Sequence, residues 1–230
     1  RDLTLGTVKV AGQENNVRNA SNYLKQGDVQ DLGTRIDTTG DARLQAGRDL
    51  TAIAANATSK KGALVAVAQG DVNLLAGEAA RHWSEGRQHK SRSLLGSSQK
   101  TTRNSLQASK AVSSTFSGNT VAVQGQNVSI TGSHVVSDAR TAIAAKNDLT
   151  IQAAKETSSE SHFKETRKSS FLYNGGVAFT VGSRMLSNDR KDVSTRAAAS
   201  TVGSTKGNVT LVTGNHYQQI GSHVLAPEGD

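Results

Sequence analysis

The feature that most constrains the fold is a short pattern that recurs along the chain: a glycine, asparagine or aspartate followed by apolar residues at alternate positions. In NDLTIQA (147–153) the apolar set is Leu149, Ile151 and Ala153, and in GDVNLLA (70–76) it is Val72, Leu74 and Ala76. Such alternation behind a turn residue predicts half-buried β-strands. No comparable window has the apolar period of an α-helix. The same pattern occurs at 1–5, 40–46, 48–54, 118–123, 126–130 and 207–212.

The spacing of these strands is regular. Gly40 and Gly62 are 22 residues apart, and Gly47 and Gly70 are 23 residues apart. A period of about 20 to 30 residues that contains several short strands is typical of a solenoid, in which each coil stacks on the next. A thin tube has room for small aliphatic side chains but seldom for large rings, which fits a chain with 3% aromatic residues. We therefore predict an all-β fold, a right-handed parallel β-helix (solenoid) of roughly seven to nine coils.

A tetrapeptide that returns late in the chain fits the same architecture. Gly-Ser-His-Val begins at Gly132 and again at Gly221, and Gly-Thr-Arg-Ile begins at Gly33. The third position holds histidine twice and arginine once, an exchange that an inward-facing or liganding position would not tolerate. We interpret the glycine as a corner that needs unusual backbone angles, the aliphatic residue as inward-facing and the histidine as solvent-facing.

Two segments, residues 81–117 and 155–206, interrupt the coil pattern. They carry net charges of +6 and +4 in a chain whose total is +8, so the basicity of the chain belongs to these segments. Asn174-Gly175 in the second segment predicts a tight hairpin turn. We therefore expect both to leave the helix as β-hairpins or long loops on one side. Six of the eight aromatic residues also lie in them: Trp83, Phe116, Phe163, Phe171, Tyr173 and Phe179.

Two interpretations of these segments remain open. They are solvated hairpins whose aromatic rings pack on the flank of the helix, or they contact a negatively charged surface such as lipopolysaccharide or a partner protein. For the second interpretation we select residues with basic or aromatic character. The candidate interaction residues are Trp83, Arg87, Lys90, Arg92, His162, Phe163, Lys164, Arg167, Lys168, Phe171 and Tyr173.

The sequence offers no pattern for catalysis, for a cofactor or for a metal. A polysaccharide-cleaving β-helix needs clustered carboxylates, whereas Asp41, Asp49, Asp71 and Asp148 are single residues at turns. The chain has no cysteine and no phosphate-binding loop. The basic residues are diluted by serine and threonine and match no nucleic-acid-binding module. We predict a non-enzyme with no cofactor and no nucleic-acid partner.

The chain starts and stops within its own repeat pattern. No signal peptide is visible, and no run of about 18 apolar residues could span a bilayer as a helix. We expect residues 1–230 to form a single β-helical repeat segment of a larger protein.

The coils followed by SHFKETRKSS and by GNVTLVTGNHYQQIGSHVLAPEGD resemble the haemagglutinin repeats of two-partner-secreted exoproteins, the family of filamentous haemagglutinin and of contact-dependent growth-inhibition exoproteins. The resemblance covers nearly the whole chain from about Gly27, and it is strongest at 118–170 and 203–230. It implies a Gram-negative protein that crosses the periplasm, leaves through an outer-membrane transporter and extends from the cell surface as a β-helical filament.

The resemblance also implies three candidate roles. In the growth-inhibition exoproteins the second repeat region is associated with moving a toxin through the outer membrane of a target cell, and the chain looks most like that region. In the plain haemagglutinins the repeats serve adhesion to glycans or host surfaces. A purely structural stalk is the third role. The sequence does not separate these three.

Overall fold

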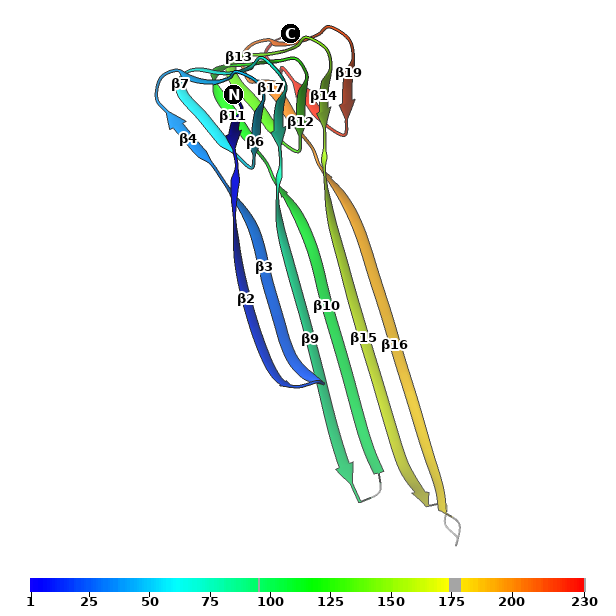
Figure 1. The fold of residues 1–230 in the computed structure, drawn as a ribbon. Coiled ribbons are helices and arrows are strands. Elements are labelled where there is room, and N and C mark those ends of the chain that lie inside the picture. The colour runs from blue at the N-terminus through cyan, green and yellow to red at the C-terminus, as the bar shows by residue number, and fades with distance from the viewer. Residues whose placement is uncertain (95, 174–178, 230) are drawn as a thin grey trace.

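The computed structural model describes residues 1–94, 96–173 and 179–229, and for residues 171–173 and 179–181 it describes the backbone alone. All regular elements in these ranges are β-strands. Two parallel sheets form a solenoid, and a third, antiparallel sheet projects from one side of it (Figure 1). The predicted all-β parallel β-helix is confirmed. In the described part of the chain, no helix is long and apolar enough to cross a membrane.

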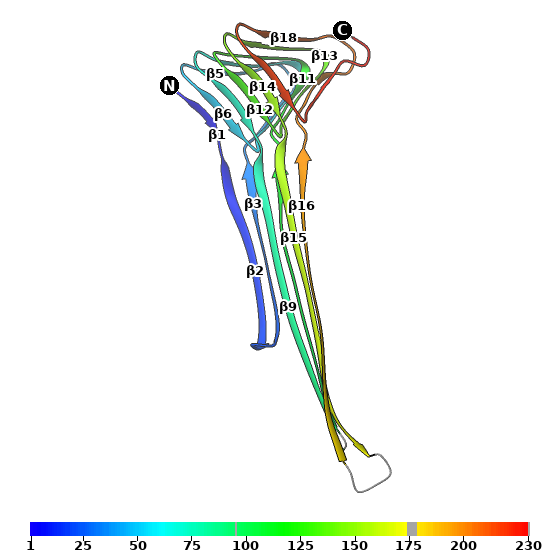
Figure 2. The same cartoon turned by 90° about the vertical axis from the view of Figure 1, so that its right-hand side faces the viewer.

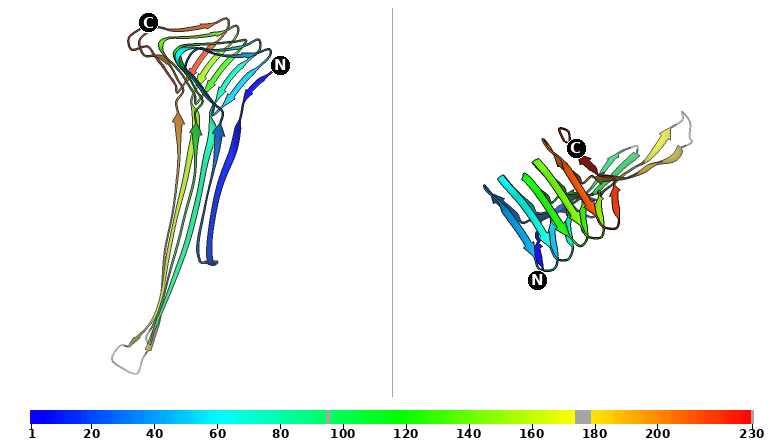
Figure 3. Two further views of the ribbon diagram at one scale, coloured as in Figure 1. Left: turned by 90° about the vertical axis from the view of Figure 1, so that its left-hand side faces the viewer. Right: turned by 90° about the horizontal axis from the view of Figure 1, so that it is seen from above.

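The first parallel sheet takes one short strand from every coil. In order through the sheet its strands are β1 (Leu3–Leu5), β6 (Leu50–Ile53), β8 (Val72–Leu75), β12 (Val128–Thr131), β14 (Leu149–Gln152) and β19 (Tyr217–Ile220). Figure 3 shows the coils stacked one on another when the solenoid is viewed from above. The described residues therefore form six coils, and the predicted number of seven to nine is wrong.

The second parallel sheet covers the rest of each coil. Three coils contribute one long strand each, two coils contribute a pair of shorter strands each, and the last coil contributes a single short strand. The strands are β4 (Arg35–Thr38), β5 (Ala42–Ala46), β7 (Asn56–Ala68), β11 (Thr115–Gly125), β13 (His134–Ala145), β17 (Thr201–Ser204), β18 (Val209–Thr213) and β20 (His223–Leu225).

The core is a set of ladders in which equivalent residues of successive coils stack. Leu74, Ile130 and Ile151 are neighbours in one such ladder, and all three are fully buried. Their burial confirms the inward positions that alternation predicts for β8 and β14. Ala76 and Ala153, the last members of the predicted inward sets, are only partly buried because the chain leaves the solenoid there and enters a hairpin.

The antiparallel sheet is built from three long hairpins. Their strands are β2 (Thr7–Asn19) and β3 (Asn22–Gly33), β9 (Gly77–Ser93) and β10 (Gly96–Val112), and β15 (Ala154–Tyr173) and β16 (Phe179–Ala198). The hairpins also pair with one another, because β3 pairs with β9 and β10 pairs with β15. The result is one continuous six-stranded sheet in the order β16-β15-β10-β9-β3-β2.

These hairpins refine the predicted interruptions and correct two details. The second and third hairpins span residues 77–112 and 154–198, where the sequence pattern marks 81–117 and 155–206. Phe116 is not part of a hairpin: it lies on β11 and is fully buried in the core. Residues 7–33 form a hairpin that the sequence pattern does not predict, which lowers the number of coils. The predicted Asn174-Gly175 turn lies outside the described residues.

The continuous hairpin sheet follows from a match of dimensions. Hairpins replace the corner of the first, third and fifth coils, after β1, β8 and β14. Neighbouring strands lie about 4.8 Å apart in any sheet. Two coils therefore advance the solenoid by about two strand spacings, which is the width of one hairpin. Because hairpins occur on every second coil, they meet edge to edge without a gap or a clash.

The coils without a hairpin turn through a single left-handed residue. Gly132 and Gly221 have φ angles of 55° and 56°, a conformation that glycine adopts readily. The predicted corner role is confirmed for these two glycines, whereas Gly33 is the last residue of the first hairpin and does not have a positive φ. In the position after the serine, His134 is partly exposed and His223 is exposed. The histidines therefore point away from the core.

Buried serines complete the corners that follow hairpins. Ser200 is fully buried, and its hydroxyl donates to the Gln152 carbonyl (2.6 Å) and accepts the Ser133 backbone N–H (3.1 Å). Ser114 takes the equivalent place in the third coil and accepts the Ala55 N–H (3.0 Å). Each hydroxyl thus satisfies a backbone donor that the solenoid buries.

Replacing Ser200 with alanine is expected to lower the free energy of unfolding by about 1–3 kcal/mol, because the buried Ser133 N–H loses its acceptor. Chemical denaturation measures the change. Ser222→Ala is the matched control, since the Ser222 hydroxyl donates only to the Ile220 carbonyl of its own corner, and its expected change is within about 0.5 kcal/mol. Equal losses in the two variants would show that Ser200 has no special role.

Candidate interaction surface

The hairpin sheet extends well beyond the solenoid as a single layer, seen nearly edge on in Figure 2. Both of its faces are therefore open along most of their length. Side chains alternate between the faces along a strand, and directly opposite residues share a face. Trp83 lies opposite Leu106 and defines the Trp83 face, whereas Phe163 lies opposite Arg103 and defines the Phe163 face.

The register divides the predicted interaction residues between the two faces. The Trp83 face carries Trp83, Arg87, His162, Lys164 and Lys168. The Phe163 face carries Lys90, Arg92, Phe163 and Arg167. The backbones of Phe171 and Tyr173 belong to β15, and their side chains lie outside the described residues. The predicted set is therefore not one cluster. Nine further cations on β9, β10, β15 and β16 were not among the predicted residues, and they include Lys100, Arg103 and Arg184.

An open groove of about 580 Å³ lies on the sheet where the first two hairpins meet. The Trp83 side chain lines it together with Glu14, Gln26, Asp28 and Arg81. Gln26 Nε2 donates a 2.6 Å hydrogen bond to Glu14 Oε2. An aromatic ring beside carboxylate, amide and guanidinium groups suits a polar ligand that has one apolar face, such as a sugar ring.

The charges of the Phe163 face are partly compensated within the face. The guanidinium of Arg103 lies 5.6 Å from the centre of the Phe163 ring, within the range of a cation–π contact. Arg167 Nε lies 2.8 Å from Glu165 Oε1. Asp189 is directly opposite Phe163 on the same face. This face therefore combines cations with acidic and aromatic partners.

Charge is also divided along the length of the second and third hairpins. We define their outer half as residues 86–93, 96–103, 163–170 and 182–189, and their inner half as residues 77–85, 104–112, 154–162 and 190–198. The outer half contains nine lysines and arginines and two acidic residues, whereas the inner half contains six and five. The basicity of the hairpins is therefore concentrated far from the solenoid.

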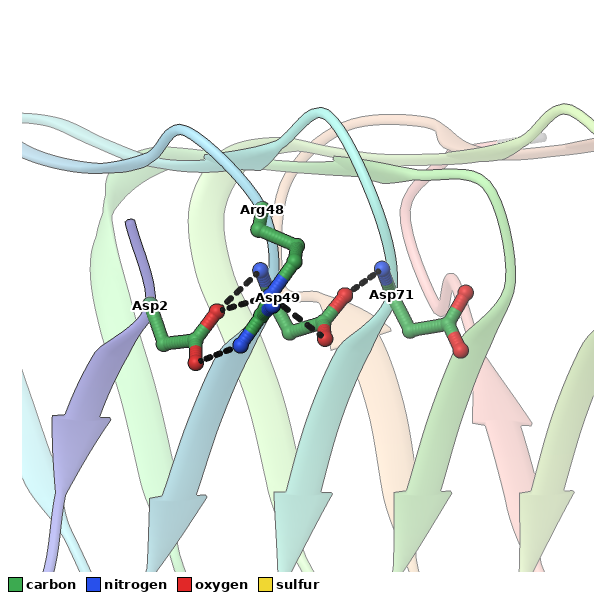
Figure 4. A network of polar contacts seen from close by, with 4 residues as sticks. All are labelled: Asp2, Arg48, Asp49 and Asp71. Atoms are coloured by element: carbon green, nitrogen blue, oxygen red, sulfur yellow. Dashed lines mark hydrogen bonds and ion pairs between the residues drawn. The ribbon is translucent and has the colours of Figure 1, made fainter.

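Aspartates at equivalent positions of successive coils, among them Asp2, Asp49 and Asp71, form a structural ladder at one corner (Figure 4). Asp49 Oδ1 accepts the backbone N–H of Asp71 (2.9 Å), and Asp71 Oδ1 accepts that of Asn127 (3.2 Å) in the next coil. Hydrogen bonds from the Arg48 side chain, together with the Asp49 backbone N–H, lower the pKa of Asp2 to about 2. Each carboxylate thus fixes the start of the following coil, as the turn interpretation predicts.

In the ranges that the structure describes, no group of three or more histidine, cysteine, aspartate or glutamate side chains is arranged to hold a metal ion. The six histidines of the chain are distributed over hairpins and coil corners. The hairpin sheet, with its groove and its basic outer half, is therefore the candidate site that the described residues provide.

In a comparison with protein families, residues 93–229 match the hemagglutinin repeat. That range includes β10, the third hairpin, and the strands β11, β13, β17, β18 and β20 of the second parallel sheet. No solved structure matches the chain.

Several similar proteins bear the name CdiA. A tRNA nuclease CdiA of Escherichia coli O6:K15:H31 is 41% identical over 122 residues, which is 52% of this chain and 4% of that protein. A 16S rRNA endonuclease CdiA of Enterobacter cloacae is 34% identical over 201 residues, 86% of this chain and 6% of that protein. A toxin CdiA of Escherichia coli is 36% identical over 202 residues, again 86% and 6%. The chain thus spans only a small part of each relative.

Proposed function

The chain belongs to the haemagglutinin-repeat family, and from that premise we propose that its hairpin sheet aids toxin delivery at the outer membrane of a neighbouring bacterium. Family membership makes the chain a repeat segment of a secreted or cell-surface exoprotein of a Gram-negative bacterium, exported by two-partner secretion through an outer-membrane transporter. We propose that the exoprotein crosses the periplasm on its way out. We also propose that the segment is non-catalytic and acts by contact with the target-cell envelope.

The basic outer half of the hairpin sheet carries this proposal. A solenoid that served only as a spacer would not need three hairpins with long strands such as β9 and β15. A single-layer sheet buries little apolar surface, so its ordering gains little from a hydrophobic core. Nine cations against two acids give its outer half a field that favours an anionic surface.

A parent exoprotein without its hairpins tests the proposal. Residues 7–33, 77–112 and 154–198 are each replaced by the Gly-Ser corner of the hairpin-free coils, which keeps all six coils in register. Target-cell attachment and target-cell killing are scored separately, with surface display of the parent as the control. We expect attachment to persist and killing to fall to the level of a parent without toxin. Killing at the level of the intact parent would contradict the proposal. The segment would then serve only as a structural stalk.

A second candidate function, adhesion to surface glycans, is favoured by the groove beside Trp83. The groove combines an aromatic side chain with the polar groups of Glu14, Gln26, Asp28 and Arg81, a combination suited to a sugar. Loss of attachment in the hairpin-free parent would support this adhesin function over delivery.

A further inference from the structure

The two faces of the hairpin sheet differ in charge, and the difference is confined to the outer half. On the Trp83 face the outer half contains Arg87, Lys100, Lys164, Lys168 and Arg184 and no acidic residue among the described strands. On the Phe163 face it contains four cations together with Glu165 and Asp189. We propose that the outer half of the Trp83 face binds the phosphate groups of lipopolysaccharide.

The cross-strand neighbours of Lys164 and Lys168 leave the charge of these two side chains uncompensated. Lys164 lies between Thr102 and Asn188 across the strands. Lys168 lies between Ser98 and Arg184. The direct pairing of Lys168 with Arg184 places like charges opposite each other, which destabilises a sheet. An anion that bridges the two side chains would relieve this repulsion.

The remaining cations extend the same field across neighbouring strands. Lys100 on β10 lies opposite His89 and Thr166. Arg87 pairs with Glu85 in the inner half, whereas Lys100, Lys164 and Lys168 make no ion pair with a described residue. Adjacent strands are about 4.8 Å apart, so the ammonium groups form a dense array. Hydroxyl and amide groups between them add hydrogen-bond donors for phosphate oxygens.

Lipopolysaccharide is the phosphate source that fits the location of the protein. This choice rests on the proposed function, because a secreted exoprotein that acts on a neighbouring Gram-negative cell meets the outer leaflet of its outer membrane first. Clusters of lysine and arginine are attracted to an anionic membrane surface, and the attraction weakens with salt. Nucleic acid, which also presents many phosphate groups, is an outcome of the test.

The test compares two variants of the 230-residue chain that lose the same charge from opposite faces. The first carries Lys100→Gln, Lys164→Gln, Lys168→Gln and Arg184→Gln on the Trp83 face. The second carries Lys90→Gln, Arg92→Gln, Arg103→Gln and Arg167→Gln on the Phe163 face. Co-sedimentation measures binding to phosphatidylcholine vesicles with and without lipopolysaccharide. Circular dichroism confirms that both variants keep their β-structure.

We expect the first variant to bind lipopolysaccharide vesicles at least about tenfold more weakly than the unmodified chain. The second variant should lose no more than about threefold, because Arg103 and Arg167 already have partners on that face and Glu165 and Asp189 lower its net charge. Equal losses would show that only net charge matters and would overturn the assignment to one face. Unchanged binding of the first variant would also overturn it.

Two further binding experiments identify the ligand. Binding to enzymatically dephosphorylated lipopolysaccharide should fall as far as the first variant falls, and retained binding would exclude the phosphates. Duplex DNA that displaced the chain from the vesicles at equal phosphate concentration would assign the surface to nucleic acid instead. A first variant that loses lipopolysaccharide binding but still kills target cells within the parent would uphold this inference and contradict the proposed role in delivery.

Discussion

Replacing Phe116 with alanine is expected to lower the free energy of unfolding by about 3–5 kcal/mol. The ring is fully buried, and it lies in a ladder between Ala57 of β7 and Val135 of β13. Hydrogen bonds to both neighbouring strands hold the backbone at a fixed spacing, so the coils cannot collapse into the space that the ring leaves. The cost therefore combines lost burial with a persistent cavity.

Urea denaturation followed by circular dichroism measures this loss. Leu186→Ala is the control, because the Leu186 side chain on β16 is 62% exposed and its removal should change the free energy of unfolding by no more than about 0.5 kcal/mol. A small effect of Phe116→Ala, similar to that of the control, would place the ring outside the core. Such a result would support the alternative that Phe116 belongs to an exposed segment.

Deleting the fourth coil, which has no hairpin, is expected to separate the second hairpin from the third. The seam that is lost is the pairing of β10 with β15. Removal of residues 127–147 joins the third coil to the fifth, with β14 in the place of β12, so that Val72 stacks on Leu149 as it now stacks on Val128. The second and third hairpins then start on adjacent coils, about 4.8 Å apart. Each hairpin needs twice that width, so β10 and β15 cannot keep their pairing.

Deletion of residues 49–70 is the matched control for this experiment. It removes the other hairpin-free coil between two hairpins, and it brings the first and second hairpins onto adjacent coils. It leaves the spacing of the second and third hairpins unchanged. The seam between β10 and β15 should therefore persist in this variant and be lost in the other. Loss of the seam in both variants would point to general unfolding rather than to the match of spacings.

The solenoid could be predicted from the sequence because its strands are buried on one side. Alternation marks Val72, Leu74, Leu149 and Ile151 as inward-facing, and all four are buried. Alternation did not mark Phe116 as inward-facing because a register shift in β11 between Gly118 and Thr120 interrupts the period-two pattern. The Ser-rich sequence before it also resembles the hairpin that it follows.

The hairpin sheet could be predicted only in part because both of its faces are exposed. Without a buried side there is no apolar period to detect, and the first hairpin, residues 7–33, gives almost no signal. Its valines Val8 and Val10 alternate, yet they are 67% and 53% exposed. The one local sequence signal for this hairpin is its asparagine-rich turn, where Asn19 Oδ1 accepts hydrogen bonds from the backbone N–H groups of Ser21 and Asn22.

The candidate interaction residues could be chosen from the sequence by type but not by face. The face of a residue depends on the register of a hairpin and on its pairing with the next hairpin, and neither is set by local sequence. Lys100 and Arg184 were missed for the same reason, since they join Lys164 and Lys168 only after β10, β15 and β16 are placed side by side.

The three hairpins form one continuous sheet, and a cysteine cross-link across the seam between β10 and β15 tests this continuity. The chain has no native cysteine. Ser97 Oγ and Ser169 Oγ lie 2.7 Å apart across this seam, in the outer half of the sheet, within the reach of a disulfide. Ser170 neighbours Ser169 but points to the opposite face.

Mild oxidation of the Ser97→Cys, Ser169→Cys variant is followed by titration of free thiols, in the native chain and in both coil deletions. We predict rapid loss of both thiols in the native chain and in the chain that lacks residues 49–70. Slow loss is predicted in the chain that lacks residues 127–147 and in the Ser97→Cys, Ser170→Cys control. Free thiols that persist in the native chain, or equal rates for the two cysteine pairs, would show that the hairpins are independent of one another.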